Sequence, residues 1–256
     1  MRFASLGSGS RGNATLVQHG ETCLLVDCGF SARETEQRLA RLKLAPEQLT
    51  AVLVTHEHGD HISGVGPLAR KYRLPVWATG GTVSADRFGD GARGSTRVQR
   101  ICSHTAFAIG DIEVQPFPVP HDAREPCQFV FGNGDRRLGM LTDVGSRTPH
   151  IEEQLAACDA LILECNHHPD LLANGDYPPA LKRRVGGDHG HLSNGQAAEI
   201  LGRIDTARLT QLVAAHLSEK HNTPALARAA LADVLGCAHD WITVADQQTG
   251  FEWRDV

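Results

Sequence analysis

The chain has 256 residues, of which 41% are hydrophobic and 21% charged, and its formal net charge is -5 at pH 7. This composition is typical of a globular protein large enough to bury a substantial core, and it excludes the fibrous and disordered classes. The negative charge excludes a global basic field, so binding to nucleic acid would need metal cations or local basic clusters.

Export and membrane insertion are not indicated anywhere in the sequence. Residues 1–10 lack the apolar stretch of a signal peptide, and no segment approaches the roughly 20 apolar residues that cross a bilayer. The seven cysteines are an odd number without a C-x-x-C pair, so reduced and partly buried thiols are expected. We therefore expect a cytoplasmic protein with no membrane partner, and its oligomeric state stays open.

Hydrophobic patterning predicts strands in hairpins first, and then strands that alternate with helices. The first half is expected to contain strands at Arg2–Leu6, Thr15–Gln18 and Thr22–Val26, a helix at Ser31–Leu42, a strand at Leu49–Val54, a helix at His61–Tyr72 and a strand at Pro75–Ala78. The second half is expected to contain strand-rich stretches at Phe107–Pro120 and Gln128–Leu141, a helix at Pro149–Ala157, a strand at Ala160–Leu163, a helix at Asn194–Ile204, a strand at Leu209–Ala214, a helix at Pro224–Leu235 and a closing strand at Trp241–Val244. No repeat or linker divides residues 1–256, so a single domain of the α/β (α+β) class is predicted, with sheets layered by helices.

Five of the apolar strand-like runs end in a residue that could bind a metal or support a metal ligand. These residues are His56, His121, Asp143, Glu164 and His216. A strand often ends in a polar residue, but five such ends, three of them histidine, are hard to attribute to chance. If the strands are roughly aligned, their carboxyl ends bring these residues to one rim, where rigid elements can hold ligand geometry closely.

The densest chemical signal is the segment Thr55–His61, which reads Thr-His-Glu-His-Gly-Asp-His. Imidazole nitrogen and carboxylate oxygen suit Zn²⁺, and also Fe or Mn. His56 and His58 alternate in an extended turn and can face one metal, while Asp60 and His61 can face a second. The following helix N-terminus would favour an anionic substrate. The alternative is an exposed histidine-rich loop, but an accidental match to this pattern is rare.

The pattern Thr-His-x-His-x-Asp-His after an apolar strand resembles the signature of the metallo-β-lactamase-fold hydrolases. The resemblance implies an αββα sandwich of two sheets with a dinuclear metal site at one edge. It also implies a first metal held by His56, His58 and His121, a second metal held by Asp60, His61 and His216, and Asp143 as the bridge between them. Each metal would keep a position for a shared water, as in an open, catalytic site.

Further segments, which cover nearly the whole chain, are similar to the YycJ/WalJ-type subgroup of that family, which is nuclease-like. They are Gly7–Asn13, Leu25–Gly29, Leu163–His167, Gly190–Asn194, Ala215–Ser218 and Asn222–Pro224. The resemblance implies phosphodiester hydrolysis of the kind a DNA exonuclease performs. His168 and His221 depart from the Asp and Asn usual in the subgroup, which bears on substrate detail and not on the metal ligands.

The two metals would lower the pKa of a bridging water to give a hydroxide, and would stabilise the entering and leaving oxygens of an in-line displacement. Asp60 is expected to orient the attacking hydroxide while it binds metal. His191 resembles a histidine of the tRNA 3′-processing endonuclease and is expected to protonate the departing alkoxide. Asp27 and Glu164 are expected to fix the ligand imidazoles, the alternative being a capping or turn carboxylate.

Several histidines and basic residues keep two interpretations. His167 and His168 either border the substrate pocket or lie on the surface, and the role of His221 is open. The two basic clusters, which either contact phosphates or belong to a solvated face, are Lys182–Arg184 and Arg93, Arg97 and Arg100. The histidines for which no role is predicted are His19, His104, His150, His189 and His239.

Three functions compete. The first is a metal-dependent phosphodiesterase or nuclease with two divalent ions, zinc ahead of manganese or iron, and with DNA ahead of RNA as substrate. The second hydrolyses a small ester, thioester or lactone at the same metals, although Asp122–Pro126 lacks the glycine-rich His segment of glyoxalase-type members. The third is a non-catalytic metal-binding protein, which is disfavoured because structural zinc sites are usually closed. The native metal, strand polarity and the choice between exo- and endonuclease are not determined.

Overall fold

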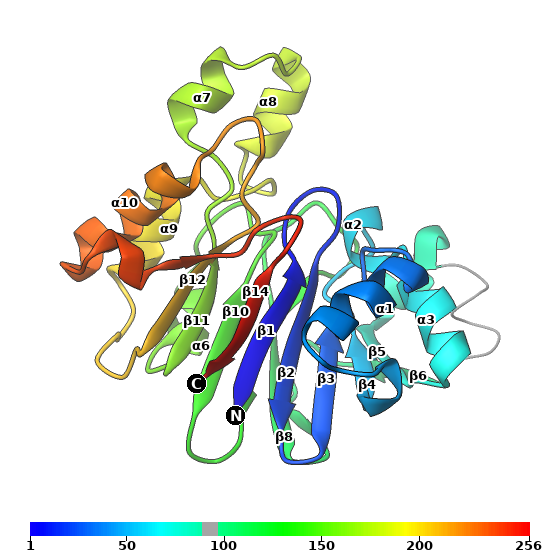
Figure 1. Cartoon of the computed structure of the whole chain (residues 1–256). Helices are drawn as coiled ribbons and strands as arrows, with labels where there is room; N and C mark the ends of the chain where they lie inside the picture. Colours follow the sequence, from blue (N-terminus) through cyan, green and yellow to red (C-terminus); the bar gives the residue numbers. More distant parts are fainter. Residues whose placement is uncertain (89–96) are drawn as a thin grey trace.

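Two sheets of seven strands each pack face to face, and helices cover their outer faces, in the computed structural model of the chain (Figure 1). The structure describes residues 1–88 and 97–256. Three separate apolar cores match this layering, with Leu39 beneath the helices of the first sheet, Phe129 between the sheets and Ile200 beneath the helices of the second. The predicted αββα sandwich is therefore confirmed.

The first sheet begins with antiparallel hairpins and continues with parallel strands, in the order β14-β1-β2-β3-β4-β5-β6. Its strands are β1 (Arg2–Gly7), β2 (Ala14–His19), β3 (Thr22–Val26), β4 (Ala51–Leu53), β5 (Val76–Thr79), β6 (Val98–Ile101) and β14 (Phe251–Asp255). The parallel part, from β3 to β6, directs the carboxyl end of β4 toward the same edge as the end of β3.

The second sheet has the order β13-β12-β11-β10-β9-β8-β7. Its strands are β7 (Phe107–Ile109), β8 (Ile112–Pro118), β9 (Cys127–Gly132), β10 (Arg137–Leu141), β11 (Ala160–Glu164), β12 (Gln211–Ala215) and β13 (Thr243–Val244). Strands β10 to β13 are parallel, and β9 is antiparallel to both β8 and β10. Because β9 runs opposite to β8 and β10 runs opposite to β9, the strands β8, β10, β11 and β12 run in one direction and end at the same edge.

The longer helices bury one face against the sheets and leave the other in solvent. Those over the first sheet are α1 (Ala32–Arg41) and α3 (Val65–Tyr72), and those over the second are α6 (Pro149–Leu155), α9 (Asn194–Leu201) and α10 (Pro224–Leu235). The shorter helices are α2 (Gly59–Ile62), α4 (Gly80–Ser84), α7 (Pro169–Asn174) and α8 (Pro179–Val185), and 3₁₀ turns occupy Pro46–Gln48, Asp86–Phe88 and His239–Trp241. No helix in residues 1–88 or 97–256 is long and apolar enough to cross a membrane.

Some element predictions are wrong or incomplete. The helix expected at His61–Tyr72 is two helices, α2 and α3, because the chain turns at Gly64. The backbone N–H of Gly64 donates to the carbonyl of Cys28 at 2.8 Å and not to the carbonyl of Asp60, which accepts from Asn13, so the helical hydrogen bonds are interrupted there. Trp241 belongs to a 3₁₀ turn and not to the closing strand. Elements absent from the prediction are β6, β14, α4, α7 and α8, all of them short.

Asp159 ties three arginines to the amino end of β11. Its carboxylate, which is only 1% exposed, accepts hydrogen bonds from the backbone N–H of Arg137 at 2.8 Å and from the guanidinium groups of Arg136 and Arg208 at 3.0 Å. Burial raises the pKa of Asp159, but the hydrogen bonds from Arg137, Arg208 and Arg136 outweigh it and lower the pKa below its ordinary value.

The Asp159→Asn variant is expected to be less stable than the wild type by about 1–3 kcal/mol at pH 7. The NH₂ group of the asparagine would face N–H groups of the arginines and could not accept their hydrogen bonds. A carboxylate with a lowered folded-state pKa stabilises above its unfolded pKa, near 3.9, and loses that contribution as the pH falls through the folded value. The difference should therefore shrink below about pH 4, as urea unfolding at several pH values would measure. Asp135→Asn is the control, since that carboxylate is 85% exposed beside the same Arg136. A pH-independent difference would contradict the prediction.

Candidate metal centre

The strand ends meet at one rim, as the sequence predicted. The registers of β10, β11 and β12 place Leu141 beside Leu163 and Glu164 beside Ala215. The three residues that follow or end these strands, Asp143, Glu164 and His216, are consequently neighbours. The backbone has positive φ at Asp27 (60°), Asp143 (54°) and His216 (54°), a conformation uncommon outside glycine. Such strain at three polar residues is typical of functional sites.

His56, His58 and His121 form the first cluster of donors. Their ligand atoms lie within 4.8 Å of one another, and His58 Nδ1 is 3.2 Å from His121 Nε2. The buried Nε2 of His56 has no hydrogen-bond partner among the described residues. The opposite ring nitrogens are held by Thr55 Oγ1 at 3.0 Å, the Asp122 carbonyl at 3.2 Å and the Gly190 carbonyl at 3.0 Å, respectively. Each ring therefore offers one nitrogen to a common centre.

Asp60, His61, Asp143 and His216 form the second cluster, whose ligand atoms also lie within 4.8 Å. Asp143 is central, because Oδ2 lies 3.3 Å from His61 Nε2 and Oδ1 lies 3.6 Å from His216 Nε2. Asp60 Oδ2 is 3.7 Å from the same His216 nitrogen. Asp143 Oδ2 and His216 Nε2 are buried, and neither has a hydrogen-bond partner in the described part of the chain. Two imidazoles and two carboxylates are a donor set that divalent cations accept.

Asp27 and Glu164 contact the imidazoles of the second cluster at Nδ1, the ring nitrogen that faces away from the cluster. Asp27 Oδ2 lies 2.8 Å from His61 Nδ1, and the same carboxylate accepts the backbone N–H and hydroxyl of Thr55, both at 2.8 Å. Glu164 Oε1 lies 3.2 Å from His216 Nδ1 and 2.9 Å from His191 Nδ1. These contacts can fix both rings with Nε2 toward the centre, which is the supporting role predicted for the two carboxylates.

The two clusters differ in electrostatic character. Burial, reinforced by the neighbouring histidines, holds the pKa of His56 well below its usual range, so the ring stays neutral with a free lone pair. At His216 burial lowers the pKa, but the neighbouring carboxylates of Asp143, Asp60 and Glu164 raise it, to about 10. The carboxylates thus make the second cluster strongly attractive to positive charge. The buried ligand atoms that lack hydrogen-bond partners, together with this distribution of charge, fit the binding of two divalent cations.

His191 adjoins both clusters. Its ring centroid lies 5.4 Å from that of His121 and 5.2 Å from that of His216, and Nδ1 lies 3.8 Å from Asp143 Oδ1. The capping box of Ser193 starts α9 directly after it, which fixes the preceding loop. Burial lowers the pKa of His191, but the carboxylate of Glu164 outweighs burial and raises it above the ordinary value.

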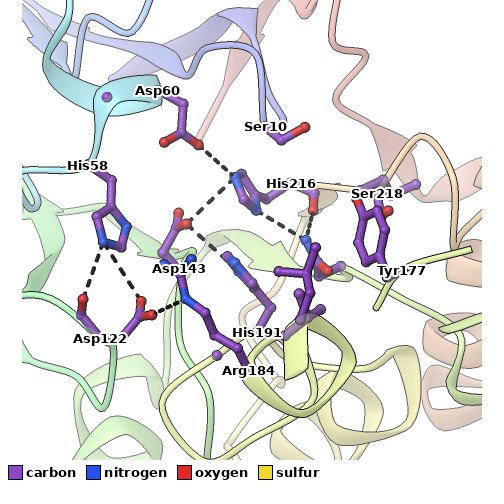
Figure 2. A pocket seen from close by; sticks show the side chains of 16 residues that line it. Ser10, His58, Asp60, Asp122, Asp143, Tyr177, Arg184, His191, His216 and Ser218 are labelled. Carbon is purple, nitrogen blue, oxygen red and sulfur yellow. Dashed lines mark hydrogen bonds and ion pairs between the residues drawn. The ribbon is translucent and has the colours of Figure 1, made fainter. Parts of the chain in front are cut away.

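A cavity of about 290 Å³ opens over the second cluster (Figure 2). Five of its lining residues were predicted from the sequence as metal ligands or catalytic groups, namely His58, Asp60, Asp143, His191 and His216. The lining residues that it did not predict include Ser10, Asp122, Asn166, Tyr177, Leu181, Val185, Leu217 and Ser218. Nothing in the sequence around Tyr177 indicates a site, because the segment reads as a proline-flanked loop. Arg184, from one predicted basic cluster, also lines the cavity and pairs with Asp122.

The remaining predicted residues have definite positions, apart from Arg93, which lies outside the described residues. His167 is buried, not on the surface, and neither it nor His168 lines this cavity. His221 is 2% exposed and packs its ring edge-on against Tyr177, with 4.2 Å between centroids. Arg97 and Arg100 do not line the cavity.

Comparison with known proteins identifies the class. The model of the β-lactamase superfamily domain matches residues 22–216, and the chain belongs to this family. The chain is 37% identical over 235 residues to the exodeoxyribonuclease YycJ of Bacillus anthracis, covering 92% of this chain and 89% of that protein. It is 34% identical over 239 residues to the exodeoxyribonuclease WalJ of Streptococcus pneumoniae serotype 2, covering 93% and 89%. The predicted resemblance to the YycJ/WalJ-type subgroup is confirmed.

Solved structures share the fold at low sequence identity. The metallo-β-lactamase fold protein YhfI from Bacillus subtilis matches with a TM-score of 0.76 and 19% identity, covering 99% of this chain and 98% of that one. Zn²⁺-bound PqqB from Methylobacterium extorquens matches with a TM-score of 0.75 and 18% identity, covering all of both chains. At these identities the likeness extends to the fold alone, and it agrees with the sandwich described above.

Proposed function

We propose that this protein is a metal-dependent phosphodiesterase that degrades DNA as an exonuclease, with two divalent ions at the rim, zinc foremost. One observation carries the proposal. Two neighbouring donor clusters contribute His58, Asp60, Asp143 and His216 to the lining of one cavity, in a chain that matches exodeoxyribonucleases over nearly its whole length. We also infer that it acts in the cytoplasm, where thiols stay reduced, because all seven cysteines are free.

The proposed roles follow from the contacts. His56, His58 and His121 would hold one metal, Asp60, His61 and His216 the other, and Asp143 would contact both. When bound, the metals would activate water and offset the charge that develops on the phosphate oxygens.

Two further side chains would act on the water and the leaving oxygen. Asp60 would orient the attacking water through the carboxylate it exposes to the cavity. His191 would protonate the leaving oxygen, with Nδ1 held by Glu164 and Nε2 left for the proton transfer.

A substrate panel tests the proposed function. Protein loaded with Zn²⁺ or Mn²⁺ is expected to release nucleotides from labelled single-stranded and duplex DNA. This activity should be lost in EDTA and restored when the metal is added back. RNA, an aryl phosphodiester and a thioester complete the panel, with bound metal measured in parallel. A protein that carries two metals per chain and hydrolyses no phosphodiester would refute the proposal. Thioester turnover above phosphodiester turnover would favour the small-ester alternative instead.

A further inference from the structure

Helices α7 and α8 form a projecting segment beside the cavity (Figure 1). The segment is tied to the rest of the fold at its base, where the backbone N–H of His168 donates to the carbonyl of His221 at 2.8 Å. Lys182 Nζ donates to the carbonyl of Ala173 at 2.6 Å and so joins the two helices. Leu172, on α7, is buried. These contacts attach the segment to the fold at one side of the cavity.

Tyr177, in the turn between α7 and α8, is held from several sides. The buried ring of His221 meets its ring at 4.2 Å and an interplanar angle of 70°. Lys220 Nζ lies 5.7 Å from its ring centroid, a distance typical of a cation–π contact. Gly175 allows this packing, since a Cβ there would lie 2.2 Å from His221 Nε2. An aromatic ring is thus positioned in the cavity lining without contributing to an apolar core.

The cavity has two chemically different walls. One wall carries the metal-site residues, and the other, which we call the Tyr177 wall, belongs to the α7–α8 segment and contributes Tyr177, Leu181 and Val185. Figure 2 shows Tyr177 on the opposite side of the cavity from His58. Its volume of about 290 Å³ is at the lower end for small-molecule sites, which suits one unpaired nucleotide better than a base pair. A nucleotide has two matching parts, because its anionic phosphate suits the metal-site wall and its flat base suits the Tyr177 wall.

We propose that the Tyr177 wall is a base-binding subsite that receives the unpaired terminal nucleotide of a DNA strand, while its phosphodiester lies at the metal clusters. Aromatic rings stack on every base, so the subsite would be tolerant of sequence. Lys220 supplies positive charge beside it, whereas Arg184, on α8, lines the cavity as an ion pair with Asp122. The inference rests on the proposed function and adds to it that the reacting unit is a frayed strand end.

The test compares two single-stranded DNA oligonucleotides that differ only at their ends, where one has ordinary bases and the other abasic residues. Wild-type protein is expected to cleave the ordinary end with a kcat/KM about 5- to 100-fold higher, the range that base–aromatic stacking provides. Tyr177→Ala should reduce this ratio to about one by slowing only the ordinary substrate, and Tyr177→Phe should retain it. Leu171→Ala is the matched control, because Leu171 is exposed on α7 and outside the cavity lining.

Each outcome is decisive. Equal wild-type rates on the two oligonucleotides would overturn the subsite, as would a Tyr177→Ala variant that slows both by the same factor. The wild-type ratio and Tyr177→Phe decide the matter even if the alanine variant fails to fold. A wild-type protein that cleaves neither oligonucleotide nor any other phosphodiester would refute the proposed function itself, which is a distinguishable failure.

Discussion

Replacement of His58 by alanine is expected to lower kcat/KM for phosphodiester hydrolysis by about a thousandfold or more. The variant would leave only His56 and His121 in the first cluster, and the charge stabilisation that one metal supplies corresponds to several kcal/mol. Folding should be little affected, because the His58 side chain is 23% exposed and makes no capping hydrogen bond to α2. The measurements are the steady-state rate on DNA, the metal content per chain and the thermal unfolding midpoint.

The matched control is His104→Ala, which removes an exposed histidine that belongs to neither donor cluster. We expect this control to keep both metals and full activity, whereas His58→Ala should fall from two metals to one. Retention of two tightly held metals and of wild-type activity by His58→Ala would contradict the proposed ligand set.

His191→Ala is expected to slow hydrolysis of DNA by about 10²- to 10⁴-fold, the contribution of a general acid. The effect should depend on the leaving group. A nitrophenolate leaves without protonation, so an aryl phosphodiester should be hydrolysed by the variant at close to the wild-type rate, whereas the alkoxide of a sugar should not leave readily. The comparison of kcat on the two substrates measures this directly.

His189→Ala is the control for His191, since it changes an exposed side chain in the same loop and keeps the backbone carbonyl that accepts from Asp122. An equal loss on both substrates would assign His191 to metal binding or to structure, and not to proton transfer.

The donors of the site could be recognised in the sequence because each is coupled to a local pattern. Thr55–His61 is contiguous, so chain geometry alone brings its histidines near one another. His121, Asp143 and His216 follow apolar strands, and strands that run in one direction end at one edge. The α/β (α+β) class followed from the alternation of strands and helices, whereas the sandwich of two sheets followed only from the family resemblance that these motifs carry.

The far wall of the cavity could not be predicted, because no local pattern encodes it. Tyr177 lies in a proline-flanked turn, and its place depends on His221, 44 residues away along the chain and itself without a predicted role. The break between α2 and α3 is similar, because the backbone N–H of Gly64 donates to the carbonyl of the distant Cys28 and not to a carbonyl of its own helix. The sequence by itself indicated which groups are candidate metal ligands. Only the tertiary structure decided what faces them, because packing between distant segments is set by shape and not by periodicity.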